Sequence, residues 1–454
     1  MNKSIEDSLL SWSILIYMPY ANDLSSCAEP IIASISTGME QGTSVENKLG
    51  KVSVFLQRKC RGQAAMRRDF WDSSFCAKQS YCNHISDWAE PSSHNSSSVI
   101  TFSNFLNWVG TTGLNSSNYL IIILGHGGSI LEICPDEDFS SWLSLEDAAI
   151  ALHSFNLLVK NNLRMLFLQN CCKSSLSAIH SLRSLSAVHV LASPTILAAP
   201  NEYYCSLIQS LFVNPNCTAL ELSARIVGYE PSENYGILAC FRINNSQQFL
   251  ESLTVFFSLL FKFYYDADST CIEEILLQLR EYINIYHTGK ISDRYVDLIG
   301  FCKVLHDKAV QVSIDSKEIA LLQDSYNAVL NHFKDFAVFV SVSSSFAVKN
   351  WCGLSMYFPF GCHSTSLPKS AVAYPFSGLH EPDVQRSLQP LLAIVPTLAA
   401  LFDLFKSREM HYKEEFEAAV SRYRELSPPS ISKGVSVWVS PWMRQQMENS
   451  DVNT

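Results

Sequence analysis

The chain has 454 residues, of which 47% are hydrophobic and 17% are charged. This length and composition exclude a disordered chain and predict a globular protein with a large core, divided into two packed units. The 33 basic and 43 acidic residues give a net charge of -10. Nucleic acid is excluded as a partner, because binding it needs a basic face.

Cysteine usage and hydropathy limit the chain further. The 14 cysteines are too sparse for a disulfide scaffold and show no C-x2-C spacing, so we expect reduced thiols and no metal site. Glu6 and Asp7 stand where a signal peptide has basic residues. The apolar run 391–405 contains Pro396 and is too short to span a bilayer. We predict no membrane span, and a location that is cytoplasmic or reached by export without a classical signal peptide.

Apolar strands alternate with helical stretches in the first half of the chain. The predicted strands are Trp12–Met18, Val52–Gln57, Tyr119–Leu124, Met165–Gln169 and Ala187–Ala192. A helix is predicted over residues 102–109, and the segment from Ser144 to Asp147 matches the capping box that begins another. The alternation predicts an α/β fold whose mostly parallel sheet is flanked by helices.

The pattern changes after about residue 250 to long helical stretches at residues 249–263, 271–287 and 316–336. We therefore predict an α/β domain over residues 10–250 and a helical region over residues 251–426. A late strand is expected near residues 353–358, within the helical region. The remaining residues, 427–454, are predicted to form a polar tail.

Two of the predicted strands end on chemically active residues. The strand 119–124 leads to His126, and the strand 165–169 leads to Cys171. Because the carboxyl ends of parallel strands meet at one edge of a sheet, we expect the imidazole and the thiol to lie close together. A nearby imidazole activates a thiol as a nucleophile, which predicts a Cys-His dyad that forms a covalent thioester acyl-enzyme. Gly127 has no side chain to keep its N–H from an oxyanion.

Several motifs, taken in order, resemble the clostripain family of cysteine peptidases, which belongs to the caspase-like clan. They are residues 12–17 with 22–24, 102–108, 142–147, 295–298 and 353–359. The resemblance covers residues 12–362 and implies a caspase-like peptidase domain that hydrolyses peptide or protein substrates. It also implies an oxyanion hole formed by the N–H groups of Gly127 and Cys171. The family register favours Cys171 over Cys172 as the nucleophile.

The sequence departs from this family in the expected substrate pocket. Gln169 stands where the family has an acid that helps to bind an Arg or Lys side chain, and a buried cation left unpaired is costly. Ser193 begins a segment that often carries acids in the family and carries none here. Glu202 is the nearest acid that can substitute, and the alternative interpretation is a solvent-exposed loop residue. The predicted substrate-binding residues are therefore Gln169, Ser193 and Glu202, and the preference for the residue before the cleaved bond (P1) stays open.

A basic cluster follows the second predicted strand and has two interpretations. It consists of Arg58, Lys59, Arg61, Arg67 and Arg68. We predict a solvated loop here, because a charge cluster after a strand is usually a solvated face. The alternative follows from caspases, which have a Gln at the position of Gln169 and combine it with arginines to bind an acidic substrate residue.

Calcium and self-cleavage are the remaining questions that the resemblance raises. Members of the family often respond to calcium, and Asp136, Glu137 and Asp138 lie together, although crowded carboxylates are more often simply hydrated. We expect no cofactor, with calcium as the one candidate. No Lys or Arg lies between Gly127 and Val159, so we expect no Arg- or Lys-directed self-cleavage there.

Two alternative functions remain. A serine hydrolase needs a Gly-x-Ser-x-Gly elbow, which the sequence lacks. The second alternative is a catalytically silent caspase-like module that binds partners or acts as an effector, and the altered Gln169 makes it more plausible here than in a standard member of the family.

Overall fold

The computed structural model describes most of the first 357 residues and little beyond them. The described residues are 10–46, 48–73, 94–112, 116–128, 131–185, 187–265, 295–312, 315–344, 350–357 and parts of 271–278 and 391–401. They fall into two compact units. Unit 1 consists of residues 1–174, 178–244 and 336–353, and the other residues belong to unit 2. The predicted helix 271–287 and the tail from 427 lie largely or wholly outside the described residues, and the domain bounds stay a prediction.

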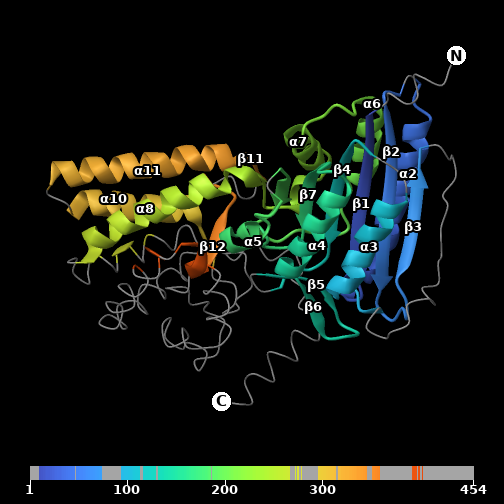
Figure 1. Ribbon diagram of the computed structural model, residues 1–454, viewed down its shortest axis with the longest axis horizontal. Helices are drawn as coiled ribbons and strands as arrows, with labels where there is room; N and C mark the ends of the chain where they lie inside the picture. Colours follow the sequence, from blue (N-terminus) through green and yellow to red (C-terminus); the bar gives the residue numbers. More distant parts are fainter. Residues whose placement is uncertain are drawn as a thin grey trace. The chain divides into compact units, whose positions relative to one another are not determined.

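Unit 1 is built on one sheet with the strand order β11-β9-β8-β7-β4-β1-β2-β3 (Figure 1). The predicted strands are present as β1 (Leu10–Tyr20), β2 (Gly50–Cys60), β4 (Asn118–Leu124), β7 (Leu163–Gln169) and β8 (His189–Ala192), and all pair in parallel. The sheet ends in antiparallel strands that were not predicted, namely β3 (Arg67–Asp72), β9 (Ile237–Arg242) and β11 (Ala337–Val342). The predicted α/β fold with a mostly parallel sheet is confirmed.

Helices cover both faces of this sheet (Figure 1). The expected helices appear as α3 (Val99–Thr111) and α4 (Leu145–Leu158), and the Ser144 side chain caps α4 by accepting from the N–H of Asp147. The remaining elements of the first half are α2 (Ala28–Thr43), the short α5 (Leu176–Ser181), α6 (Tyr204–Val213), α7 (Ala219–Tyr229) and the hairpin of β5 (Glu132–Asp136) and β6 (Ser141–Ser144).

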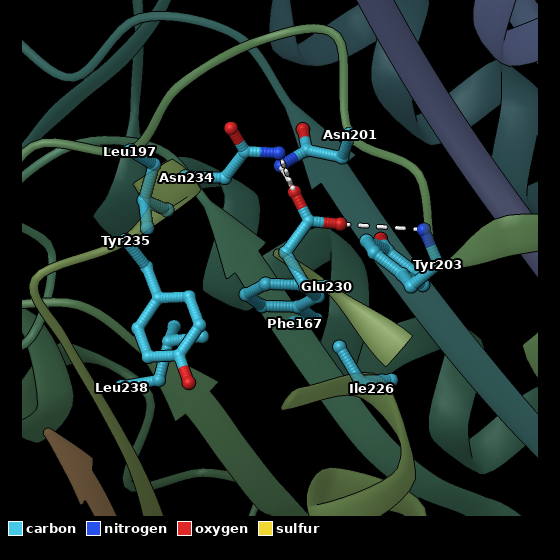
Figure 2. A pocket seen from close by; sticks show the side chains of 9 residues that line it. All are labelled: Phe167, Leu197, Asn201, Tyr203, Ile226, Glu230, Asn234, Tyr235 and Leu238. Carbon is cyan, nitrogen blue, oxygen red and sulfur yellow. Dashed lines mark hydrogen bonds between the residues drawn. The ribbon is translucent and has the colours of Figure 1, made fainter. Parts of the chain in front are cut away.

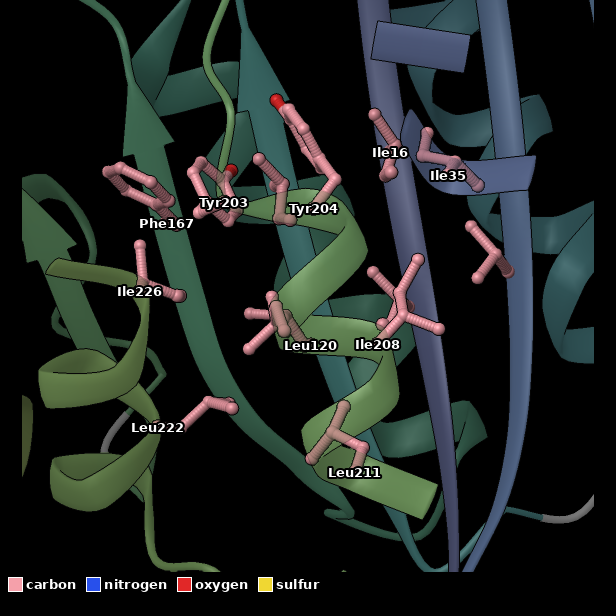
Figure 3. Packing of buried hydrophobic residues seen from close by; sticks show 14 of the residues in the cluster. Ile16, Ile35, Leu120, Phe167, Tyr203, Tyr204, Ile208, Leu211, Leu222 and Ile226 are labelled. Atoms are coloured by element: carbon pink, nitrogen blue, oxygen red, sulfur yellow. The ribbon is translucent and has the colours of Figure 1, made fainter. Parts of the chain in front are cut away.

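The period-two pattern of β1 decides which helices pack on which face. Ile14 and Ile16 point into one hydrophobic cluster with apolar side chains of α2, α6 and α7 (Figure 3). Tyr17 points to the other face, where its ring lies 4.9 Å from that of Phe102 in α3. Helices cover both faces of β1, so its side chains on both faces are buried. This is why its sequence is a nearly continuous apolar run.

The basic cluster is not a solvated loop, so that prediction is wrong. Arg58 and Lys59 lie within β2 and are buried. Arg58 pairs with Asp69 of β3 and with Glu29. The Lys59 ammonium lies 3.0 Å from the carboxylate of Asp136, which is itself fully buried. Two of the five cations are thus neutralised inside the fold, while Arg61 and Arg67 are exposed.

Unit 2 contains three long helices and a two-stranded sheet among its described residues. The helices are α8 (Ser246–Tyr265), α10 (Leu298–Val312) and α11 (Ser316–Phe336), and β10 (Tyr295–Asp297) pairs antiparallel with β12 (Ser355–Tyr357). Aromatic pairs such as Phe257 with Phe301 hold α8 against α10. The predicted helices at 249–263 and 316–336 and the late strand are confirmed. No helix in the described part of the chain is long and apolar enough to cross a membrane.

Replacing Lys59 with Met should destabilise unit 1, because it leaves the buried Asp136 carboxylate without its cation. Breaking one side of a buried ion pair costs about 3–5 kcal/mol. Urea unfolding followed by circular dichroism measures the loss. The matched control is Arg61→Met, which removes a half-exposed partner of Glu137 and should change the free energy of unfolding by less than about 1 kcal/mol. Equal midpoints for both variants would contradict this account.

Candidate active site

His126 lies two residues beyond the carboxyl end of β4, in a segment that folds back on β5. The N–H of Gly128 donates to Glu132, and the N–H of Cys134 donates to the carbonyl of His126, each at 2.9 Å. These two bonds flank the bridge between Gly127 and Ile133. In such a pair the N–H of Gly127 takes no part in the ladder and points away from β5.

Cys171 lies two residues beyond the carboxyl end of β7, beside this segment. In the β4/β7 register Leu124 is opposite Gln169, so the two loops leave the sheet at the same level. The Asn170 side-chain amide donates to the carbonyl of Gly125 at 2.9 Å and to that of His126 at 3.3 Å. The neighbouring strands thus bring the segments of His126 and Cys171 together, as the sequence predicted for their elements.

The backbones of Gly127 and Cys171 approach more closely than any other residue at position 127 would allow. A Cβ built on Gly127 would lie 2.0 Å from the carbonyl oxygen of Cys171. Only a residue without a side chain fits there. The contact fixes the N–H of Gly127 near the thiol.

Several amides converge on the half-buried Cys171 thiol. The Leu197 N–H lies 3.4 Å from the sulfur, and the thiol in turn faces the Leu197 carbonyl at 3.8 Å. Burial raises the pKa of the Cys171 thiol, whereas the N–H groups of Leu197, Gly127 and Cys171 itself and the charge of Lys173 lower it. The donors that the sequence assigned to an oxyanion hole therefore lie around this sulfur.

Asp23 is a partner of His126 that the sequence analysis did not single out. Its carboxylate lies 2.6 Å from Nε2 of the imidazole. The Asn22 side chain caps the turn that follows β1, accepting from Leu24 and donating to Pro135, and this fixes Asp23 as the first residue of the turn. The sequence held a signal for Asp23, since residues 22–24 belong to one of the motifs that resemble the family. With Nε2 held by a carboxylate, Nδ1 is the ring nitrogen left to exchange a proton.

Gln169 is buried, and its side chain is fully engaged. Its carbonyl oxygen accepts from the hydroxyls of Tyr203, at 2.6 Å, and Tyr204, at 3.1 Å, and its amide donates to Asn201. Burial raises the pKa of both tyrosines, which keeps them protonated as donors. The neutral amide thus accepts from one set of groups and donates to another, which a carboxylate cannot do.

Neither of the other two predicted substrate-binding residues lines the pocket that lies beside the thiol. Ser193 is fully buried, and its hydroxyl bonds within its own turn, to Thr195. The Glu202 side chain is exposed to solvent. No sequence pattern pointed to Glu230, which follows α7 and carries a buried carboxylate in this region. It accepts from the side chains of Asn201 and Asn234 and from the N–H groups of Glu202 and Tyr203.

Glu230 lines a small pocket together with Leu197 (Figure 2). The pocket lies beside the thiol, because the Leu197 N–H contacts the Cys171 sulfur. The lining residues are Phe167, Leu197, Asn201, Tyr203, Ile226, Glu230, Asn234, Tyr235 and Leu238. The pocket is small, with room for about one water molecule. Most of its lining residues are apolar or aromatic, and the one acidic residue among them is Glu230.

The carboxylates considered for calcium each have a cationic partner. Lys59 contacts both Asp136 and Asp138, and Arg61 lies 3.5 Å from Glu137. Within the described ranges no group of three or more His, Cys, Asp or Glu side chains is placed to hold a metal ion.

Gly127→Ala should lower the thermal unfolding midpoint, because the new methyl group would collide with a backbone oxygen that cannot move like a side chain. Overpacking of this kind costs about 1–3 kcal/mol. Gly228→Ala is the matched control: it lies in α7 with nothing within 4 Å of the added Cβ, and it should leave the midpoint unchanged or slightly raised. A Gly127→Ala protein as stable as Gly228→Ala would refute the close approach.

Comparison with solved structures identifies the fold. No protein-family model and no curated protein matches the sequence. A secreted C11 cysteine protease from Bacteroides thetaiotaomicron, solved with an irreversible peptide inhibitor, is similar with a TM-score of 0.51 and 14% identity over 86% of this chain and 99% of the other. An inactive zymogen C11 protease from Parabacteroides distasonis gives a TM-score of 0.49 and 14% identity over 77% and 92%. The first similarity confirms the fold that the resemblance implied: this chain has the caspase-like fold of the C11, or clostripain-family, cysteine proteases.

Proposed function

We propose that this protein is a clostripain-like cysteine endopeptidase that uses Cys171 as nucleophile and His126 as general base and acid. The observation that carries the proposal is the convergence of both segments at the ends of β4 and β7, where Gly127 lies against Cys171. The shared fold with C11 proteases supports hydrolysis of peptide bonds. The substrate is a peptide or protein, and the chemistry needs no cofactor.

The proposed reaction follows from the contacts around the thiol. His126 takes the thiol proton, and the Cys171 sulfur attacks the carbonyl carbon of the scissile bond. The carbonyl oxygen becomes an oxyanion, which the N–H groups of Gly127 and Cys171 stabilise. The imidazolium, held by Asp23, gives its proton to the leaving amine as the C–N bond breaks, leaving a thioester. Water then attacks the thioester with His126 as base, releasing the acid and restoring the thiol.

Single substitutions test this assignment. Cys171→Ala should abolish turnover of a peptide library, and His126→Ala should reduce it by about 10²- to 10⁴-fold, the usual contribution of general acid–base catalysis. Cys172→Ala is the matched control and should retain turnover. A wild-type protein as inert as Cys171→Ala across a broad library would instead indicate the silent interaction module. Turnover that is lost in Cys172→Ala and kept in Cys171→Ala would reverse the choice of nucleophile.

The P1 preference should follow the negative charge of Glu230. We propose that the pocket beside Leu197 receives the P1 side chain after widening. A buried carboxylate in its wall then disfavours an acidic side chain. A preference for an acidic P1 side chain would need arginines in the pocket. Arg58 instead pairs with Asp69, and Arg68 lies over the Trp108 ring.

Peptides that differ only in Glu or Gln at P1 measure this preference. We expect kcat/KM to be at least about tenfold higher for the Gln peptide than for the Glu peptide. A tenfold ratio corresponds to the interaction energy that shifts a pKa by one unit. The ratio should fall towards one in Glu230→Gln, which keeps the shape of the side chain and removes its charge. Preference of the wild type for the Glu peptide would overturn the assignment of this pocket.

A further inference from the structure

Lys173 is a fully buried lysine two residues after the proposed nucleophile. Lysine is rarely buried completely, because removing an ammonium from water is costly unless the surroundings stabilise the charge. Here Nζ donates to the carbonyl of Gly128 at 3.2 Å. A buried cation so close to the thiol suggests a part in its chemistry rather than in packing alone.

The side chain of Lys173 lies close to Gly127. Its Cε would be 3.0 Å from a Cβ on Gly127, which is closer than most real Cβ contacts, so the lysine packs against the space that a side chain at 127 would fill. Lys173 thus holds the Gly127–Gly128 segment by a hydrogen bond and by packing. The same segment supplies the N–H that faces the Cys171 sulfur.

The charge of Lys173 acts on the thiols around it. It lowers the pKa of the Cys171 thiol against the larger opposing effect of burial. It also lowers the pKa of Cys134 in β5, although burial raises that pKa to about 12. Both sulfurs lie within its field, and Cys171 is the one that is partly open to solvent.

We propose that Lys173 is a positioning residue for the proposed peptidase reaction: its buried ammonium fixes the Gly127 N–H beside Cys171 and stabilises negative charge on the sulfur and on the oxyanion. The inference rests on the proposed function and deepens it. His126 alone supplies little net positive charge, because its imidazolium is paired with the Asp23 carboxylate at 2.6 Å. Lys173 therefore provides the positive field that the thiolate needs.

The other ionisable groups near this site are few and can be kept constant. His126 and Asp23 lie on the β4 and β1 sides, Cys134 and Glu132 on β5, and Cys172 follows the nucleophile. None of them is altered in a Lys173 variant. A shift in the titration of Cys171 on changing Lys173 therefore reports the loss of its charge.

The test is the pH dependence of Cys171 alkylation by iodoacetamide, measured by mass spectrometry of the peptide that contains it. In Lys173→Gln, whose amide can still donate to Gly128, the pH of half-maximal rate should rise by about one unit, so alkylation slows about tenfold below that pH. Lys173→Arg keeps the charge and should titrate close to the wild type. If Lys173→Gln does not fold, Lys173→Met is titrated in its place.

Lys59→Met is the matched control, because it removes another buried lysine and lowers stability without touching the thiol. Its Cys171 titration should equal that of the wild type. An unchanged or lower midpoint in the neutral Lys173 variants, or an equal rise in Lys59→Met, would overturn the proposal. Alkylation requires no peptide turnover, so a wild-type protein that shows the Lys173-dependent shift but cleaves no peptide would disprove the peptidase function alone.

Discussion

The contact between Gly127 and the carbonyl of Cys171 is the constraint on which the candidate site depends. Two parallel strands can deliver an imidazole and a thiol to one edge of a sheet, but their loops must then meet without a side chain between them. Glycine at 127 permits that meeting, and the Asn170 amide holds it by bonding to the carbonyls of Gly125 and His126. The N–H groups that face the sulfur are placed by the backbone rather than by flexible side chains, so they need little rearrangement to bind an anion.

A buried carboxylate lies close to Gln169, although the residue at 169 is itself neutral. Gln169 accepts from two tyrosine hydroxyls and donates to Asn201, and Asn201 in turn donates to Glu230. A carboxylate at 169 would lack the donor that Asn201 requires. The negative charge therefore lies at the end of α7, where four neutral N–H donors stabilise it. The polar network explains why a neutral residue at 169 is compatible with a charged pocket.

The sequence predicted the parallel core because each of its strands is an apolar run on both faces. It missed the antiparallel edges for physical reasons. β3 begins with two arginines and is half-polar, and β11 follows α11 without a loop that would mark its start. The Lys59–Asp136 pair could not be predicted, because the two residues are far apart in the chain. In the sequence, a lysine that is buried with such a partner looks the same as an exposed lysine. The position of His126 and Cys171 at one edge of the sheet was predictable because each comes soon after a parallel strand, whereas Asp23, Lys173 and Glu230 make their contacts with residues far from them in the chain.

The groups around the thiol and those that line the pocket come from different parts of the fold. Asp23, His126, Cys171 and Lys173 all follow β1, β4 or β7, the parallel strands at the centre of the sheet. The pocket is lined mainly by residues after β8 and around α7. The loops that line the pocket can change sequence without disturbing the central strands, which are buried on both faces. The α7 side of the pocket can therefore vary in sequence while the strands that place the thiol stay the same.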